Sequence, residues 1–195
     1  MKQWSLNFRL WHWINAIVIT GLLGTVFLRK TFLSYRTNSE TIMDKLSDIN
    51  ITIAKDQAVS IARAIRSPMW DWHIWLGYAL AALVVWRIVL FFTDSGKQNY
   101  QNCSQKTTHD KIVSLLYVIF YALMFAMAAT GLVLHFHEFF NVSKDLGHSI
   151  KEVHELLYNG ILYFVIIHIA GVILAENKDE KGIISNMVGK SETTL

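Results

Sequence analysis

Four long apolar runs constrain the fold of this chain more than any other feature of its sequence. They cover about residues 10–28, 72–92, 112–136 and 153–175. A helix needs about 20 mainly apolar residues to cross the ~30 Å hydrocarbon layer of a membrane, and each run is about that long or longer. We therefore predict an all-α fold, an integral membrane four-helix bundle that forms a single domain over residues 1–195.

The composition agrees with a membrane protein and excludes several other classes. The chain is 53% hydrophobic and only 17% charged, which fits neither a disordered chain nor an ordinary soluble domain. Its single cysteine, Cys103, excludes an intrachain disulfide framework and a thiolate metal cluster, and the lack of a C-x-x-C-H motif excludes covalently attached haem. The basic residues are spread over the loops, so no nucleic-acid partner is expected. They divide too evenly between the two sides to fix the orientation.

The segment between the first two runs, about residues 29–71, is the only sizeable extramembrane piece. From Ile53 to Ile65 its apolar residues recur at near-helical spacing, which predicts a short amphipathic helix on the membrane surface. Pro68 is expected to end that helix, because proline disfavours helical conformation in the residue before it. The same helix could serve as a lid on the bundle or as a docking face for a partner.

Two histidines, His154 and His168, stand fourteen residues apart in the last apolar run. Fourteen steps along an α-helix return to within ~40° of the starting direction and rise ~21 Å. The two rings therefore point the same way from near opposite membrane boundaries. One metal ion cannot bridge that distance, so this spacing predicts two stacked sites.

Each site needs a second ligand from another helix. Because successive membrane helices alternate in direction, connectivity pairs His73 with His154 near one boundary and His12 with His168 near the other. The depths within the runs match better for the first pair than for the second. The other histidines near the boundaries are expected to be interfacial or exposed, with ligand replacement or proton transfer as the alternative; they are His135, His137 and His148.

Paired imidazoles on facing helices suit the iron of a haem, whose axial ligands come from the core of a helix bundle. Gly77 and Gly171 lie on the same faces as the histidines, where missing side chains would make room for a flat macrocycle. Cationic candidates for a haem propionate or a bound quinone are Arg9, Arg66, Arg87 and Lys151. Two other interpretations stay open: a membrane histidine can simply form a hydrogen bond between helices, and Arg87 can reach toward the interface.

Four segments together resemble the bacterial cytochrome b561 and nickel–iron hydrogenase b-type cytochrome subunit family. They are RLWHW in the first run, MWDWHIWLGY at the entry to the second, ATGLVL near the end of the third and VHELLYNGILYFVIIH in the fourth. The resemblance extends from about Phe8 to the tail segment GIISNMVG. The segment between His12 and His73 looks longer than in compact members of that family.

The resemblance implies a four-helix protein of the bacterial inner membrane with two non-covalent haem b groups and a cytoplasmic N-terminus. It also implies electron transfer between the quinone pool and a periplasmic-side partner such as hydrogenase, or from small donors such as superoxide. Two histidine ligands leave the iron no open position, so the haems are expected to carry electrons rather than activate oxygen.

The sequence also permits two other classes of function. One is a transporter that uses histidines to bind a metal ion or protons within the membrane. The other is a membrane anchor subunit in which haem is structural, which the long first loop would favour.

Overall fold

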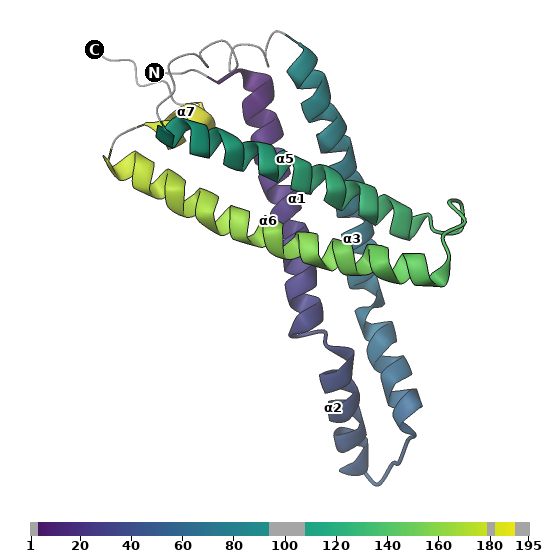
Figure 1. Cartoon of the computed structure of the whole chain (residues 1–195). Helices are drawn as coiled ribbons and strands as arrows, with labels where there is room; N and C mark the ends of the chain where they lie inside the picture. Colours follow the sequence, from purple (N-terminus) through teal and green to yellow (C-terminus); the bar gives the residue numbers. More distant parts are fainter. Residues whose placement is uncertain (1–3, 94–107, 179–181, 190–195) are drawn as a thin grey trace. The chain divides into compact units, whose positions relative to one another are not determined.

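A computed structural model describes residues 4–93, 108–178 and 182–189, and all of its regular structure is helical. The helices are α1 (Leu6–Lys30), α2 (Tyr35–Ser47), α3 (Lys55–Phe92), α5 (Thr108–His135), α6 (Lys144–Lys178) and α7 (Ile183–Val188), as Figure 1 shows. Within the described residues, four of them are long and apolar enough to cross a membrane: α1, α3, α5 and α6. The predicted all-α fold with four spanning helices is therefore confirmed.

Helix α6 begins at Lys144, well before the apolar run that predicted it. Its first turns are polar, and two local features stabilise them. Ser143 Oγ accepts a hydrogen bond from the backbone N–H of Leu146 at 3.3 Å, which satisfies one of the donors left over at a helix N-terminus. The carboxylate of Asp145 lies in the first turn, where the helix dipole favours negative charge.

The prediction that Pro68 ends a separate loop helix is wrong, because α3 runs without interruption from Lys55 through Pro68 to Phe92. A proline removes one helical hydrogen bond, but the bonds on either side remain, and long membrane helices tolerate such a gap. The amphipathic stretch from Ile53 to Ile65 therefore mostly forms the first turns of α3. The first loop does hold a separate short helix, but it is α2, earlier in the chain.

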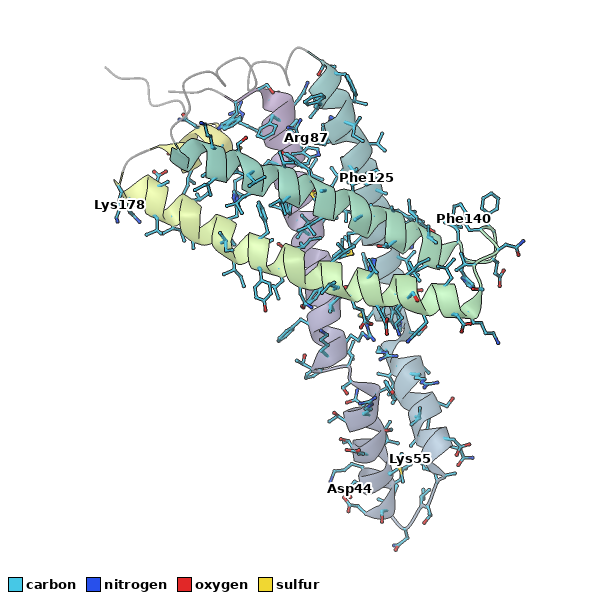
Figure 2. The ribbon with its side chains drawn as sticks, in the orientation of Figure 1. Asp44, Lys55, Arg87, Phe125, Phe140 and Lys178 are labelled. Carbon is cyan, nitrogen blue, oxygen red and sulfur yellow. The ribbon has the colours of Figure 1, made fainter. Side chains whose placement is uncertain are left out.

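The chain divides into two compact units, and the smaller one covers Val18–Gly77. In it α2 and the first part of α3 form a hairpin; Asp44 and Lys55 mark its two sides near the turn (Figure 2). Asn50 in that turn has a φ of 60°, in the left-handed region that asparagine tolerates better than most residues. The buried positions of the hairpin include small residues, with Ser39 3% exposed and Ala62 fully buried.

The larger unit covers Met1–Ile17 and Tyr78–Leu195. In it α5 and α6 lie side by side along most of their length (Figure 1). The rings of Phe120 and Phe164 stack with centroids 4.0 Å apart, and a Cβ built at Gly160 would lie 3.3 Å from Leu123. Outward side chains such as Phe125, which is 59% exposed, are apolar, as a helix surrounded by lipid requires.

Candidate functional site

The larger unit brings His12 of α1 and His168 of α6 together. Their ring centroids lie 6.2 Å apart, with the ring planes at 57°. Metal–imidazole bonds are about 2.0–2.1 Å long, so two imidazoles on opposite sides of one metal ion have centroids roughly 6 Å apart. The observed separation therefore fits two axial ligands of one iron. The two rings lie close together despite the poorer match in depth within their runs, and their pairing as ligands of one haem stays a prediction.

Aromatic side chains hold both of these imidazoles. His168 stacks on Phe164, one turn earlier on α6, with centroids 5.8 Å apart and planes at 8°. Trp13 meets the ring of His12 edge-on at 5.3 Å. The indole Nε1 of Trp13 in turn donates a hydrogen bond to the carbonyl oxygen of Met187 on α7, at 3.2 Å. The short helix α7 thus helps to position Trp13 beside His12.

One ring nitrogen of this pair has no partner in the described part of the chain. His12 Nδ1 is buried and makes no hydrogen bond. Most buried polar side-chain atoms do have a partner, so an exception needs a reason. The apolar, aromatic surroundings of the two rings suit a flat macrocycle such as haem, and an iron bound to Nε2 would leave this Nδ1 without a partner.

His154, on the same helix as His168, is held by a hydroxyl from α5. Thr130 Oγ1 lies 2.9 Å from His154 Nδ1, and it donates its own proton to the carbonyl oxygen of Ala126 at 2.7 Å. A threonine hydroxyl has only one proton to donate, so toward His154 it can only accept. The Nδ1–H of His154 is therefore the donor, and the lone pair of the ring is placed on Nε2, where a metal ligand needs it.

His73 in the smaller unit has the same arrangement. Thr25 Oγ1 lies 2.7 Å from His73 Nδ1 and donates to the carbonyl oxygen of Leu22 at 2.7 Å. Its lone pair therefore accepts from Nδ1–H, which again places the ring lone pair on Nε2. The edge of Trp70 packs against the His73 ring at 5.4 Å. Two histidines in separate units thus have the same tautomer for the same reason.

The sequence reasoning missed Thr25, Thr130 and Gly131. A Cβ built at Gly131 would lie 3.3 Å from His154 Cε1, so glycine at this position lets the imidazole lie close to α5. Thr130 and Gly131 both stand in the ATGLVL segment. A hydroxyl within an apolar span is a usable signal, because it must find a partner there, but the sequence does not say which partner.

The predicted arginines of the larger unit are Arg87, which lies among aromatic rings, and Arg9. The guanidinium carbon of Arg87 is 4.9 Å from the ring centroid of Tyr121 and 5.6 Å from that of Trp11; Figure 2 labels Arg87 on α3. Its Nε is buried without a hydrogen-bond partner in the described residues, and so is the Nε of Arg9. Arg9 also lies against Gly189 at the end of α7. Both donors suit an anionic or carbonyl oxygen.

The other predicted site residues have less specific surroundings. Lys151 is exposed on α6, and Arg66 lies beside Tyr35 in the smaller unit. A Cβ built at Gly77 or Gly171 would meet nothing within 4 Å, so nothing in the chain itself crowds these positions. Their role beside a macrocycle stays a prediction.

The peripheral histidines are arranged largely as expected. His135 and His137 are exposed at the end of α5, and the exposed His148 lies 3.2 Å from Glu152. Cys103 lies outside the described residues. Over the described ranges, no three histidine, cysteine, aspartate or glutamate side chains come together as a metal site. A zinc site made by protein alone usually needs three or four such ligands, whereas haem brings the other ligands of its iron itself.

The family of the chain follows from comparison with known proteins. A family model described as prokaryotic cytochrome b561 matches residues 3–190. Searches of curated proteins and of solved structures find no match. The match covers nearly the whole chain, including every histidine discussed above. The chain therefore belongs to the prokaryotic cytochrome b561 family and is a multi-pass bacterial membrane protein, a haem b-binding cytochrome of electron transfer.

Proposed function

We propose that this cytochrome binds two haem b groups in two tiers and carries electrons across the membrane. The electrons would pass between the quinone pool and a redox partner or donor on the periplasmic side. The observation that carries the proposal is the approach of the His12 and His168 rings, with centroids 6.2 Å apart on helices far apart in sequence. This spacing suits the two axial ligands of one haem.

The second haem is assigned to His73 and His154. Chain connectivity and the family resemblance support this pairing, and so does the matching chemistry of the two residues. Each imidazole donates Nδ1–H to a threonine whose proton is committed to a backbone carbonyl. Metal-binding histidines commonly have such a partner, which fixes the orientation and tautomer of the ring.

Haem supplies a one-electron couple between ferric and ferrous iron when it is bound. The chain contributes the ligands, their orientation and aromatic surroundings. Phe164 stacks on His168 and Trp13 meets His12 edge-on, which limits rearrangement of the two rings when the charge on the site changes. With both axial positions filled by imidazole, the site favours electron transfer over oxygen chemistry.

Cationic groups near the haems would stabilise their propionates or a quinone oxygen. Arg87 and Arg9 are the strongest candidates in the larger unit, because each has a buried Nε without a partner in the described residues. Lys151 remains a candidate near the other boundary. We also propose a cytoplasmic N-terminus, as the family resemblance implies, which puts the His12 and His168 haem on the cytoplasmic side.

A reduced-minus-oxidised spectrum with haem quantification on the purified chain tests this proposal. We expect a b-type spectrum and two haems per chain, both reducible by a quinol. A ratio of one haem per chain would contradict the second haem, which is assigned to His73 and His154. Two haems that no quinol reduces would leave the ligand assignment standing but remove the quinone pool as the electron source.

A further inference from the structure

Three arginines surround one tyrosine in the smaller unit. The guanidinium carbons of Arg63 and Arg66 each lie 5.2 Å from the ring centroid of Tyr35, and that of Arg36 lies 5.9 Å away. Arg36 Nε also donates a hydrogen bond to the Tyr35 hydroxyl at 3.4 Å. Because α2 carries Arg36 and α3 carries the other two, it is the hairpin that collects them. We call Arg36, Arg63 and Arg66 the arginine cluster.

Within the residues that the structure describes, no carboxylate balances the positive charge of this cluster. None of its arginines forms an ion pair with a carboxylate in the described residues, and Arg66 Nε is buried without a hydrogen-bond partner there. The hydrogen bond and charge of Arg36, together with the charge of Arg63, hold the pKa of Tyr35 below its ordinary value. Three like charges gathered around one ring repel one another. The group that would complete the cluster is an anion.

The cluster lies close to where the chain leaves the membrane. Helix α1 ends at Lys30, directly after the first apolar run. The guanidinium carbon of Arg29 lies 5.4 Å from the ring centroid of Trp70, and tryptophan and arginine are typical of the headgroup level. Arg66 stands one turn before Trp70 on α3. Phosphate is the anion that is abundant at this depth.

Exposed apolar side chains near the cluster in sequence distinguish a lipid from a free anion. Phe32 is 80% exposed, Ile65 is 55% exposed and Ile61 is 45% exposed. An inorganic phosphate would leave all of them in water. A phospholipid would cover them with its apolar part while its phosphate accepts the bidentate hydrogen bonds that guanidinium groups offer.

We propose that the arginine cluster binds the phosphate of an anionic phospholipid, whose apolar part covers Phe32 and Ile65. This site is independent of the haem ligands and holds whether or not the chain binds two haems. A haem propionate is the competing source of an anion for Arg66, since the sequence also makes this arginine a propionate candidate. The experiment therefore follows lipid and haem separately.

The test compares two double variants of the full-length protein in detergent, titrated with phosphatidylglycerol and followed by native mass spectrometry. Arg63→Gln with Arg66→Gln removes two charges from the cluster. Lys45→Gln with Lys55→Gln removes two charges from the same hairpin near its turn, where Figure 2 labels Lys55. Lys55 is eight residues, or about 12 Å of helix, before Arg63, which exceeds the screening length of about 8 Å in physiological salt.

Each basic side chain at a membrane surface contributes about fivefold to the binding of an anionic lipid. We therefore expect roughly 25-fold weaker phosphatidylglycerol binding in the arginine double variant and little change in the lysine double variant. If the arginine double variant does not fold, the exposed Arg63→Gln alone should weaken binding roughly fivefold. Equal weakening in the two double variants would mean that net charge alone attracts the lipid, and would overturn the proposal.

Three further arms distinguish the sources of the anion. Wild type should prefer phosphatidylglycerol over phosphatidylcholine with the same acyl chains, and the lack of a preference overturns the proposal. Thermal unfolding of wild type is also compared with inorganic phosphate and with phosphatidylglycerol. If both raise the melting temperature equally, the cluster is a site for free phosphate and the proposal is overturned. Loss of haem from the arginine double variant with unchanged lipid binding would assign Arg66 to a propionate and refute the lipid site.

Discussion

Thr130 Oγ1 lies 2.9 Å from His154 Nδ1, while its proton goes to backbone carbonyls of the preceding turn of α5. The hydroxyl therefore acts toward the imidazole purely as an acceptor. Thr25 has the same relationship to His73. By contrast, His12 Nδ1 has no hydrogen-bond partner in the described residues. In the proposed arrangement of two haems, the histidine ligands therefore differ in their hydrogen-bond partners, and we expect the two haems to differ in potential.

Thr130→Val should raise the potential of one haem and leave the other unchanged. Valine has nearly the shape of threonine but cannot accept the Nδ1–H of His154, so the ligand becomes less basic and stabilises ferric iron less. We expect a rise on the order of tens of millivolts, measured by redox titration of the purified protein. Thr130→Ser keeps the hydroxyl and should have the same haem potential as wild type. An equal shift in Thr130→Ser would mean that packing, not the hydrogen bond, sets the potential.

Gly131→Ala should weaken haem binding beside His154. The added methyl group would lie 3.3 Å from His154 Cε1, so the imidazole must move away from α5. Loss of ligand positioning commonly reduces metal affinity by about 10- to 100-fold, and haem retention during dilution measures it. Gly147→Ala is the matched control, because its methyl group would be in ordinary contact with Val142 at 3.8 Å. Similar haem loss from both variants would contradict a role specific to Gly131.

The sequence predicted the spanning helices well because backbone groups in lipid must bond within their own helix. A long apolar run in a membrane is therefore expected to form a helix. The prediction of a helix end at Pro68 was wrong because the preference of the residue before proline is local. The hydrogen bonds on both sides of Pro68 hold the long helix α3 together. The start of α6 at Lys144 was not predicted either, because its first turns are polar and are stabilised by Ser143 and Asp145.

The histidine pair of the larger unit was predictable for a similar reason. Helical periodicity and alternating helix direction are properties of the sequence, and they were enough to bring His12 and His168 together. The partners of His154 and His73 were not predictable. Whether Thr130 meets an imidazole depends on how two helices are rotated and shifted against each other, and no single helix encodes that register.

Phe164→Leu should disturb the haem held by His168. Leucine keeps the position apolar but loses the parallel stacking of Phe164 on the imidazole at 5.8 Å and on Phe120 at 4.0 Å. With less restraint, His168 should adopt a wider range of ring orientations, which broadens the low-spin electron paramagnetic resonance signal of that haem. Phe125→Leu is the control, since Phe125 is 59% exposed on α5 and should leave the signal unchanged. Equal broadening in both variants would contradict this role of Phe164.

Tyr35 should ionise below its ordinary pKa of 10.0, because Arg36 donates a hydrogen bond to it and Arg36 and Arg63 favour the phenolate. A pKa that folding lowers adds stability above the unfolded value, and this stability is lost as the pH falls through the folded value. The difference in ultraviolet absorbance between wild type and Tyr35→Phe measures the titration. Arg63→Gln should move its midpoint upward, and a midpoint at or above 10.0 in wild type would contradict the contacts described here.

The haem-to-chain ratio of histidine variants tests the central claim most directly. If His12 and His168 hold one haem and His73 and His154 hold another, His168→Ala and His154→Ala should each lower the ratio from two to one. The haem that remains should differ between these two variants in its potential. His148→Ala, which alters an exposed histidine beside Glu152, should keep both haems. Retention of two haems by His168→Ala would contradict the account.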